Sequence, residues 1–388
     1  MQLREIIHDI FGGEYILVYL GLLFLSLFVC GVISRFGHVT IDLFGRRDDL
    51  RAVQSSHEAP VPRVGGLVFY VGLAGLLPLA GHLKFDPSEV LYFLLALIPI
   101  LVVGLAEDLG WPMPPRVRLA AVAASGALML LAFGHYVPRF GVPFMDPLLT
   151  YAPVAGVLTL FMAAGVVNAF NLVDGLNGFC GFIAISTAVA LAVVAHRAGL
   201  RDFSLALTLF IPMILGFLAF NYPLGKIFLG DAGAYMIGHT LVWIGIAILD
   251  LVEDVSPFAI LLIFFWPVAD TLLAIYRRGV MRARVDRPDR LHFHQLMMRY
   301  LEIRVLGRGR RRLANPLATL CLAPLAAAPQ VLGVFFAFDN QMSAVSAFAS
   351  AAAFVAAYVV GMRSARVLSR RRVCASRAVP SVSPEPAE

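Results

Sequence analysis

Long, uninterrupted apolar windows limit how this chain can fold more than any other feature does. A helix needs about 20 apolar residues to cross a hydrocarbon layer roughly 30 Å thick. Because 60% of the 388 residues are hydrophobic and only 14% are charged, ordinary soluble cores cannot bury them. The chain is therefore predicted to be an all-α, polytopic membrane protein with about eleven transmembrane helices. The windows cover residues 15–34, 64–81, 90–106, 118–134, 153–169, 179–195, 203–221, 232–249, 257–276, 315–337 and 344–362.

Basic residues are distributed unevenly between the two sides that these windows define. Of the 31 Lys and Arg residues, 26 fall in or directly beside alternate connections and in the tail after Met362. Since cytoplasmic segments are enriched in Lys and Arg, the C-terminus is expected in the cytoplasm and the N-terminus outside. The same bias explains the net charge of +6 without nucleic acid as a partner. The other side holds Arg4, Lys84, Arg139, Arg197 and Arg201.

The domain organisation is expected to be simple. Residues 1–362 form one multi-span membrane domain, and residues 363–388 form a tail that is first basic and then rich in Pro and Ser. Acidic residues rather than a basic segment precede the first window, so a cleaved signal peptide is not expected. The four cysteines show no CxxC spacing and are interpreted as small hydrophobic residues.

Polar residues that solubility does not require gather in five segments, all at predicted cytoplasmic helix ends. The first is HEAPVPRVGGL, which places His57 and Arg63 at the membrane surface. Gly65 and Gly66 permit a close backbone approach. By itself this segment also fits an ordinary helix start with an interfacial arginine.

The second segment is GLAEDL, in which Glu107 and Asp108 end the third window, followed by Arg116 and Arg118 in PPRVRL. Acidic residues at a helix C-terminus oppose the helix dipole, so two of them are a poor choice for stability alone. The pair therefore favours a function, either in gathering Mg²⁺ or in accepting a proton from a phosphate.

The third segment, NAFNLVDGLNGF, contains Asn168, Asn171, Asp174 and Asn177 and has no Lys or Arg. Polar groups at membrane depth cost free energy unless they are paired, bind a ligand or line a cavity. Asn171 and Asp174 are three residues apart and would share one face of a helix. A turn rich in Asn and Gly is the alternative.

The fourth segment, KIFLGDAGAYMIG, carries Lys226, Gly230, Asp231 and Gly233. A carboxylate at the start of a helix is a good N-cap, which is the plain explanation of Asp231. Glycines on both sides would also allow close approach of a phosphate or metal.

The fifth segment, RPDRLHFHQ, contains Arg290, His292 and His294. The two histidines share a side if the backbone is extended, and with Arg290 they form a dense donor group for phosphate oxygens. A zinc site is the alternative, but no third His or Cys stands at metal-ligand spacing.

Together, the five segments supply oxygen ligands for a hard divalent cation and cationic groups for anionic oxygens. This combination is typical of phosphoryl transfer with Mg²⁺. Neither a P-loop nor a GxGxxG motif is present. A site at the membrane surface indicates one lipid substrate and one substrate from the cytosol.

The chain carries six motifs in this order: HEAPVPRVGGL, GLAEDL with PPRVRL, NAFNLVDGLNGF, FLGDAGA, WPVADTLLAIYRR and DRLHFH. Both the motifs and their order resemble those of the polyprenyl-phosphate N-acetylhexosamine-1-phosphate transferases, glycosyltransferase family 4. The resemblance covers residues 57–294 and is nearest to the bacterial branch that starts O-antigen, enterobacterial common antigen and teichoic acid synthesis, which belong to lipopolysaccharide and cell wall biosynthesis. It implies a multi-pass inner-membrane enzyme with about eleven helices and a cytoplasmic active site. In such a membrane, the external N-terminus expected from the basic residues would be periplasmic. Members transfer an N-acetylhexosamine-1-phosphate from a UDP-sugar to undecaprenyl phosphate and release UMP.

The resemblance also implies roles for individual residues. Asp231 and Asn171 would hold Mg²⁺, for which Mn²⁺ is an alternative, on the UDP-sugar pyrophosphate. Glu107 and Asp108 would deprotonate or orient the lipid phosphate. The substrate-binding set would comprise Asn177 at the uracil, Arg290, His292 and His294 at the pyrophosphate and sugar, and Asp174, Lys226, His57 and Arg63. Asp270 and Arg277 also match, and Asp270 is interpreted as structural.

Three positions depart from the family pattern. Glu107 replaces the usual first Asp of the acidic pair, so Asp108 is predicted to be its essential member. Gln295 stands where a third His is common, and no basic pair precedes His57. Direct attack by the lipid phosphate is the mechanism expected, with Asp108 serving more to orient than to remove a proton, and a covalent aspartyl intermediate is the alternative.

Other functions stay open at this point. The enzymes that transfer phospho-N-acetylmuramoyl-pentapeptide in peptidoglycan synthesis are the nearest enzymatic alternative. A secondary transporter would also have many spans with polar breaks, although its site would lie nearer the bilayer midplane. A catalytically inactive scaffold of the same fold is the third. The donor sugar and the oligomeric state cannot be read from the sequence, and a homodimer stays open.

Overall fold

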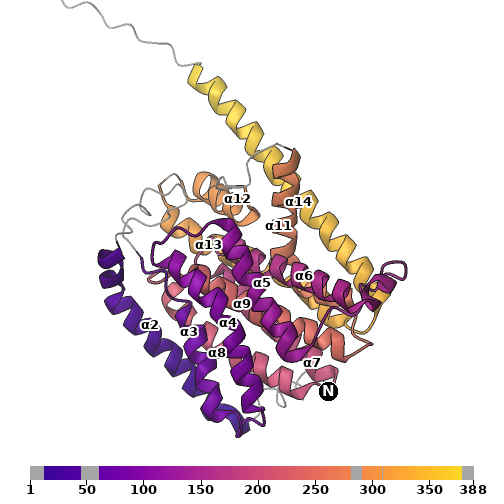
Figure 1. The fold of residues 1–388 in the computed structure, drawn as a ribbon. Helices are drawn as coiled ribbons and strands as arrows, with labels where there is room; N and C mark the ends of the chain where they lie inside the picture. The colour runs from indigo at the N-terminus through magenta and orange to yellow at the C-terminus, as the bar shows by residue number, and fades with distance from the viewer. Residues whose placement is uncertain (1–12, 45–60, 281–290, 308, 378–388) are drawn as a thin grey trace, which may run out of the picture. The chain divides into compact units, whose positions relative to one another are not determined.

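The computed structural model describes residues 13–44, 61–280, 291–307 and 309–377. Every regular element in these ranges is a helix, and no strand occurs among them. The predicted all-α class is therefore confirmed. The helices that carry the polar segments run side by side, so that segments far apart in sequence meet (Figure 1).

The element bounds are as follows. The long helices are α2 (Ile16–Phe44), α4 (Pro87–Asp108), α5 (Pro115–Phe133), α6 (Ala152–Val173), α7 (Phe179–Arg197), α8 (Arg201–Asn221), α9 (Gly230–Leu251), α13 (Arg311–Phe335) and α14 (Asn340–Arg377). The shorter ones are η1 (Gly13–Tyr15), α3 (Leu67–Leu76), η3 (Leu77–Leu79), η4 (Asp146–Thr150), α10 (Pro257–Ile263), α11 (Phe265–Val280), α12 (Phe293–Tyr300) and η5 (Leu301–Val305).

Nine of the described helices are long and apolar enough to cross a membrane, or ten if the bent pair α10 and α11 counts as one span. Each of the eleven predicted windows coincides with one helix or one such pair, which confirms a polytopic protein. One window is shorter than expected, because α3 and η3 together cover only Leu67–Leu79. At 1.5 Å per residue this stretch is about 20 Å long, less than a hydrocarbon core. The inside and outside assignment of the termini stays a prediction.

Helix α9 lies at the centre of the bundle, and nearly all of its residues are buried. A helix that is apolar on every side is expected in such a position. Its C-terminal end is held by Arg139, whose guanidinium donates to the carbonyl oxygens of Leu249 at 3.2 Å, Val252 at 3.0 Å and Val255 at 2.8 Å. One arginine thus satisfies carbonyls that a helix end leaves without internal partners.

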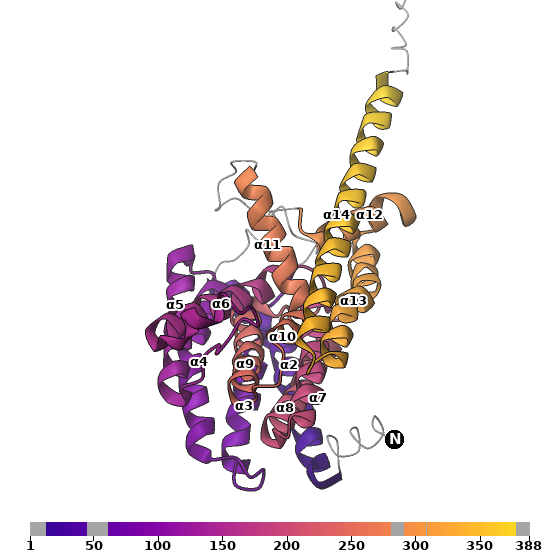
Figure 2. The ribbon, with the colours of Figure 1, turned by 90° about the vertical axis from the view of Figure 1, so that its right-hand side faces the viewer.

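Helices α10 and α11 are separated by a sharp break at Phe264, where the chain bends by 83°. The window 257–276 was expected to be one continuous span, and the structure corrects this expectation. Pro267 accounts for the break, since a proline removes one helical hydrogen bond and its ring clashes with the carbonyl four residues earlier. Figure 2 shows α11 extending from the break beyond the ends of α5 and α6.

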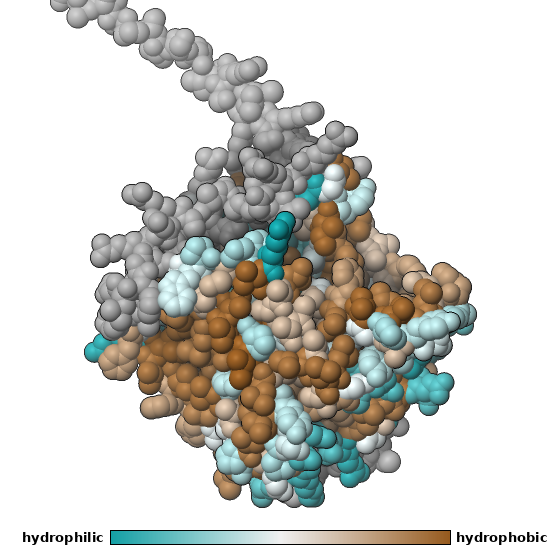
Figure 3. All heavy atoms as spheres, viewed as in Figure 1, coloured by the Kyte–Doolittle hydropathy of each residue, from teal (hydrophilic) through white to brown (hydrophobic). Residues whose placement is uncertain are grey.

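The outer surface of the bundle is strongly apolar. Large hydrophobic side chains point outward from α4, α5 and α6, among them Leu95, Leu131 and Phe161. Figure 3 shows hydrophobic side chains across the middle of one face and hydrophilic ones along its lower edge. A soluble monomer rarely exposes so large an apolar surface, whereas lipid would cover it.

The chain divides into two compact units, residues 1–347 and 348–388. All of the candidate site residues that the structure describes belong to the first unit. The predicted boundary between a membrane domain ending at residue 362 and a tail stays a prediction.

Candidate active site

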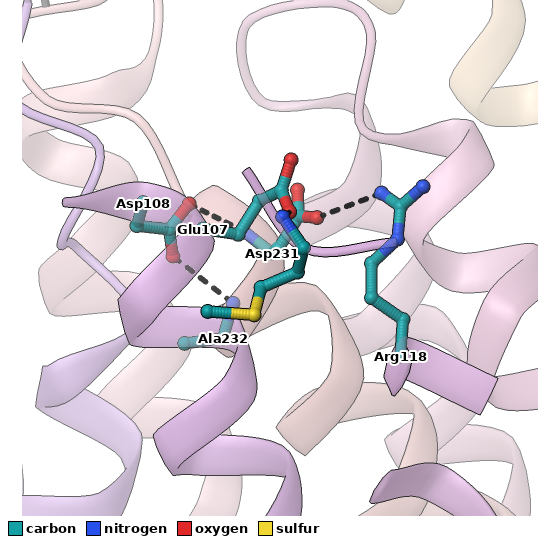
Figure 4. Close-up of polar contacts among 6 residues, drawn as sticks. Glu107, Asp108, Arg118, Asp231 and Ala232 are labelled. Atoms are coloured by element: carbon teal, nitrogen blue, oxygen red, sulfur yellow. Dashed lines mark hydrogen bonds and ion pairs between the residues drawn. The ribbon is translucent and has the colours of Figure 1, made fainter. Parts of the chain in front are cut away.

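The N-terminus of α9 is capped by a side chain from another helix. Asp108, the last residue of α4, accepts hydrogen bonds from the backbone N–H of Asp231 at 2.9 Å and of Ala232 at 3.1 Å, one to each carboxylate oxygen. Figure 4 shows the two bonds as dashed lines. The local N-cap position, Leu229, offers no side-chain acceptor. Asp108 therefore fixes the backbone that carries Asp231.

Gly230 makes this close approach possible. Its φ angle is +76°, and a Cβ atom there would lie 2.0 Å from the carbonyl oxygen of Arg63 and 2.4 Å from Oδ2 of Asp108. No other residue could occupy this position without displacing both neighbours. The GD pair of the fourth segment is thus needed for packing as well as for chemistry.

Backbone hydrogen bonds join the first segment to the fourth. The N–H groups of Gly65 and Gly66 donate to the carbonyls of Phe228 at 3.0 Å and Leu229 at 2.8 Å, and Phe228 N–H donates to Pro62 at 2.8 Å. The close backbone approach expected of the two glycines is therefore present, and it draws these residues out of α3.

The carboxylate of Asp231 faces a cation from α5. Its Oδ2 lies 3.5 Å from Nη1 of Arg118, and the two side chains are 14% and 29% exposed (Figure 4). Glu107 is half-buried, and its Oε2 accepts a hydrogen bond from the backbone N–H of Met113 at 2.8 Å. The two acidic residues of the pair thus differ, because Asp108 is buried against α9 while Glu107 supports the loop before α5.

Asn171 reaches the same place from the last turn of α6. Helix α6 packs against α9, and Asn171 interacts with Tyr235, which stands one helical turn after Asp231 on α9 and interacts electrostatically with it. The two predicted metal ligands, Asn171 and Asp231, therefore lie on neighbouring helices.

Asp174 follows the end of α6, outside the helix. Burial raises the pKa of its carboxyl group to about 7, the charge of Asp231 acts in the same direction, and the Arg63 guanidinium acts against both. Asp174, Arg63 and Asp231 thus influence one another, although three different segments supply them.

The histidine segment is organised by Asp270 of α11. Oδ2 of Asp270 is 3.0 Å from Nδ1 of His292 and 3.6 Å from Nδ1 of His294, while Oδ1 accepts the backbone N–H of Phe293 at 3.1 Å. The two imidazole rings stack with their centroids 5.6 Å apart. Arg277, two turns later on α11, donates to the carbonyl of Leu291 at 3.1 Å.

His294 also joins this segment to the third one. A Cβ atom on Gly175 would lie 2.3 Å from Nε2 of His294, so only a glycine leaves room for the imidazole ring. The ring of Phe179 is 6.1 Å from that of His294. The loop that follows α6 and the start of α12 are therefore in direct contact.

Asn177 occupies a structural position in that loop. Its side-chain amide donates to the carbonyl of Pro223 at 3.0 Å, its backbone N–H donates to Asn315 at 2.8 Å, and its carbonyl accepts from Thr319 at 2.8 Å. Lys226 is exposed. His57 and Arg290 lie outside the described residues.

Two residues at the site were not assigned a role from the sequence. Arg118 stands in a quoted motif, PPRVRL, but only the fold shows that it pairs with Asp231. Tyr235 could have been found from its spacing, since residues four apart share a helix face. Asn221 is a further supporting residue, and its side chain accepts from Gly178 at 2.6 Å and donates to Ile227 at 2.8 Å.

The assembled group can bind phosphates and a divalent cation without a metal cage made by the protein alone. Among the described residues, no group of three or more His, Cys, Asp or Glu side chains is arranged to hold a metal ion. Mg²⁺ in phosphoryl transfer takes one or two protein oxygens and completes its shell with substrate phosphates and water. Asp231 with Asn171 fits that requirement, and Arg63, Arg118 and the histidines provide positive or hydrogen-bonding groups around it.

Comparison with known proteins gives consistent results. Residues 90–249 match the family model described as glycosyl transferase family 4. An undecaprenyl-phosphate alpha-N-acetylglucosaminyl 1-phosphate transferase from Escherichia coli (strain K12) is 29% identical over 287 residues, 69% of this chain and 76% of the relative. A protein from Bacillus subtilis (strain 168), described as a probable undecaprenyl-phosphate N-acetylglucosaminyl 1-phosphate transferase, is 28% identical over 248 residues, 63% of this chain and 67% of the relative.

Proposed function

We propose that this chain is a member of glycosyl transferase family 4 and that it transfers an N-acetylhexosamine-1-phosphate from a UDP-sugar to undecaprenyl phosphate and releases UMP. The relatives are named for this transfer with N-acetylglucosamine. The reaction would take place at the cytoplasmic face of a bacterial inner membrane and would start a cell-surface polysaccharide.

One observation carries the proposal: residues from five separate segments meet at one end of the bundle. Arg63, Asp108, Asn171, Asp231 and His294 are connected through direct contacts or through a shared neighbour. Such a group could hold a diphosphate, whereas isolated helix caps would have no reason to converge.

In the proposed reaction, an oxygen of the lipid phosphate attacks the β-phosphorus of the UDP-sugar. The new bond joins the lipid phosphate to the sugar phosphate, and the bond from the β-phosphorus to the bridging oxygen breaks, so UMP leaves with that oxygen. A phosphate monoester is already largely ionised at pH 7, and a general base therefore has little proton to remove. The chain's main task is to position the two phosphates and stabilise charge in the transition state.

The two acidic residues that end α4 would divide this task. Both oxygens of Asp108 accept backbone N–H groups, so we propose that it orients Asp231 rather than removing a proton. Glu107, which is less buried, would be the acid that faces the lipid phosphate. Arg118 would hold the Asp231 carboxylate in place and add positive charge beside the phosphates.

Transferases of this kind are generally metal-dependent, and the residues here fit Mg²⁺ or Mn²⁺. Asp231 and Asn171 would hold the ion, which would neutralise charge on the pyrophosphate. His292 and His294, fixed by Asp270, would bind the pyrophosphate and sugar from the other side.

The proposal is tested by measuring UMP release in membranes that carry the intact chain, with undecaprenyl phosphate and a panel of UDP-N-acetylhexosamines. Asp231→Asn keeps the size of the side chain and removes its charge, and we expect the rate to fall at least about 100-fold. Asp86→Asn is the matched control, because Asp86 caps the opposite end of α4 through Ser88 N–H at 2.8 Å and lies in no contact with the site.

Each outcome has a clear meaning. No UMP from any UDP-N-acetylhexosamine in the presence of the lipid acceptor would contradict the transfer reaction and favour a transporter or an inactive scaffold. Turnover of a UDP-muramoyl-pentapeptide instead would place the chain with the peptidoglycan enzymes. Equal rates of UMP release for the intact chain and Asp231→Asn would contradict the assignment of Asp231 as a metal ligand.

A further inference from the structure

The break between α10 and α11 leaves a carbonyl group without its helical partner. In a continuous helix, the carbonyl of Ile263 would accept the N–H of residue 267, but Pro267 has none. Ile263 is fully buried. Inside a membrane no water reaches such a group, so a neighbouring helix has to supply the donor.

Gln330 of α13 supplies it. Its side-chain Nε2 donates to the carbonyl of Ile263 at 3.0 Å and to Oγ1 of Thr187 on α7 at 2.9 Å. Gln330 and Thr187 are both buried, and the two hydrogen bonds of Gln330 connect α7 and α13 to the break.

The local packing brings α13 close enough for this bond. A Cβ atom on Gly333 would lie 2.7 Å from the carbonyl oxygen of Ala259 and 3.1 Å from a side-chain carbon of Ile263. Because Gly333 has no side chain, α13 contacts the backbone of α10 one turn from Gln330. The contact extends along α10 from Ala259 to Ile263.

We propose that Gln330 is a positioning residue for the transfer reaction: it fixes the direction of α11 and thereby places Asp270 against His292 and His294. This role rests on the function proposed above. α11 is joined to α10 through the break and also packs against α6 and α13, so its direction depends on these contacts together with whatever holds the break. Among the described residues, the one side-chain hydrogen bond to the Ile263 carbonyl, which lacks its helical partner, comes from Gln330.

The geometry makes the site sensitive to this direction. Asp270 stands seven residues after Ile263, about 10 Å along a helix axis. A change of about 10° in the bend would move Asp270 by roughly 2 Å at that distance. Its contact with His292 is only 3.0 Å long, so such a shift would break it. A displacement of about 1 Å in a positioned group can cost a factor of about 100 in rate.

The test compares three variants of the full chain in membranes. Gln330→Met keeps the length and helix propensity of the side chain but removes the donor. Gln330→Glu keeps a donor, because a carboxyl group buried this deeply stays protonated. Thr187→Val removes only the second acceptor and leaves the bond to Ile263, so it is the matched control.

The first readout needs no substrate. Spin labels are attached at Tyr276→Cys on α11 and Leu131→Cys on α5, both exposed positions, in a background without native cysteines. We expect Gln330→Met to shift or broaden the distance distribution, and Gln330→Glu and Thr187→Val to keep that of the parent. An unchanged distribution in Gln330→Met, or the same change in Thr187→Val, would overturn the proposal.

The second readout is the rate of UMP release. We expect kcat to fall at least about 10-fold in Gln330→Met and to stay within about 3-fold of the parent in the other two variants. A distance change with a parental kcat would overturn the link to the histidine segment. If the parent itself releases no UMP, the proposed function fails, while the distance measurement still decides whether Gln330 directs α11.

Discussion

At the scale of single residues, the site depends on two glycines whose lack of a side chain leaves space for neighbouring groups. Gly230 lies between the carbonyl of Arg63 and the carboxylate of Asp108 with a positive φ angle, and Gly175 leaves space for the ring of His294. Both glycines stand next to an acidic residue in their motifs. The DG and GD pairs are therefore units in which one residue supplies the charge and the other supplies the room.

Gly230→Ala should cost both folding free energy and activity. A residue with a side chain at positive φ costs about 1–2 kcal/mol, and the contact with Arg63 and Asp108 adds to it. Gly199→Ala is the matched control, because Gly199 has φ +81° and a Cβ atom there would meet no other atom within 4 Å. Thermal unfolding in detergent measures the comparison, and an equal loss in both variants would show that the close contact has no effect.

The residue scale is also where sequence reasoning reached its limit. The clustering of Asn171, Asp174, Asp231 and the histidines was predictable, because polar groups at helix ends on one side of a membrane have few other partners. It was not predictable that both carboxylate oxygens of Asp108 accept backbone N–H groups of α9, since its neighbour Glu107 has the same charge. Which of two adjacent acids turns inward depends on the helix that packs against them.

At the scale of helices, α9 is held at both ends by side chains from elsewhere in the chain. Asp108 accepts N–H groups at its start, and Arg139 donates to carbonyls at its end. A negative group at the N-terminus and a positive group at the C-terminus both complement the helix dipole. The two ends nevertheless have different duties, because only the first one carries site residues.

Arg139→Ala should therefore separate stability from catalysis. Hydrogen bonds to a charged group contribute about 1.5–3 kcal/mol, so we expect a lower unfolding temperature and an unchanged kcat for the molecules that stay folded. Arg139→Lys retains the charge but cannot donate to several carbonyls at once, so its unfolding temperature should lie between those of the parent and Arg139→Ala. A large loss of kcat in Arg139→Ala at a temperature where it stays folded would contradict this separation.

The apolar windows predicted where helices occur but not how each one is used. In window 64–81, Gly65 and Gly66 lie outside the helix and donate hydrogen bonds to another segment. Window 257–276 is bent near Pro267. Hydropathy measures only the tendency to leave water, which a broken helix or a short one satisfies as well as a straight one. The proline in WPVAD was the available signal for the bend, although not for an angle of 83°.

At the scale of the whole molecule, alternation of helix direction brings the functional ends together. The end of α4, the start of α5, the end of α6 and the start of α9 all contribute to one group of contacts. Asp86 and Arg139 lie at the opposite ends of α4 and α9. The distribution of Lys and Arg in the sequence predicts that the first group lies on the cytoplasmic side.

Labelling with a thiol reagent that does not cross membranes tests this orientation. Lys84→Cys and Lys226→Cys place single thiols at exposed positions on the two sides, in a background without native cysteines. We expect Lys84→Cys to react in cells whose inner membrane is intact and Lys226→Cys to react only after that membrane is opened. Labelling of Lys226→Cys but not of Lys84→Cys in cells with an intact inner membrane would contradict the predicted orientation and place the site on the outer side.

The chain order of the groups that hold α9 and α11 bears on how the enzyme matures during translation. Asp108 and Arg139 are both synthesised before α9, so the central helix meets its two charged partners as it leaves the ribosome. Gln330 is synthesised well after α10 and α11. A nascent chain can thus complete the α9 end of its site early. If Gln330 directs α11 as proposed, the histidines reach their final place only after α13 has been synthesised.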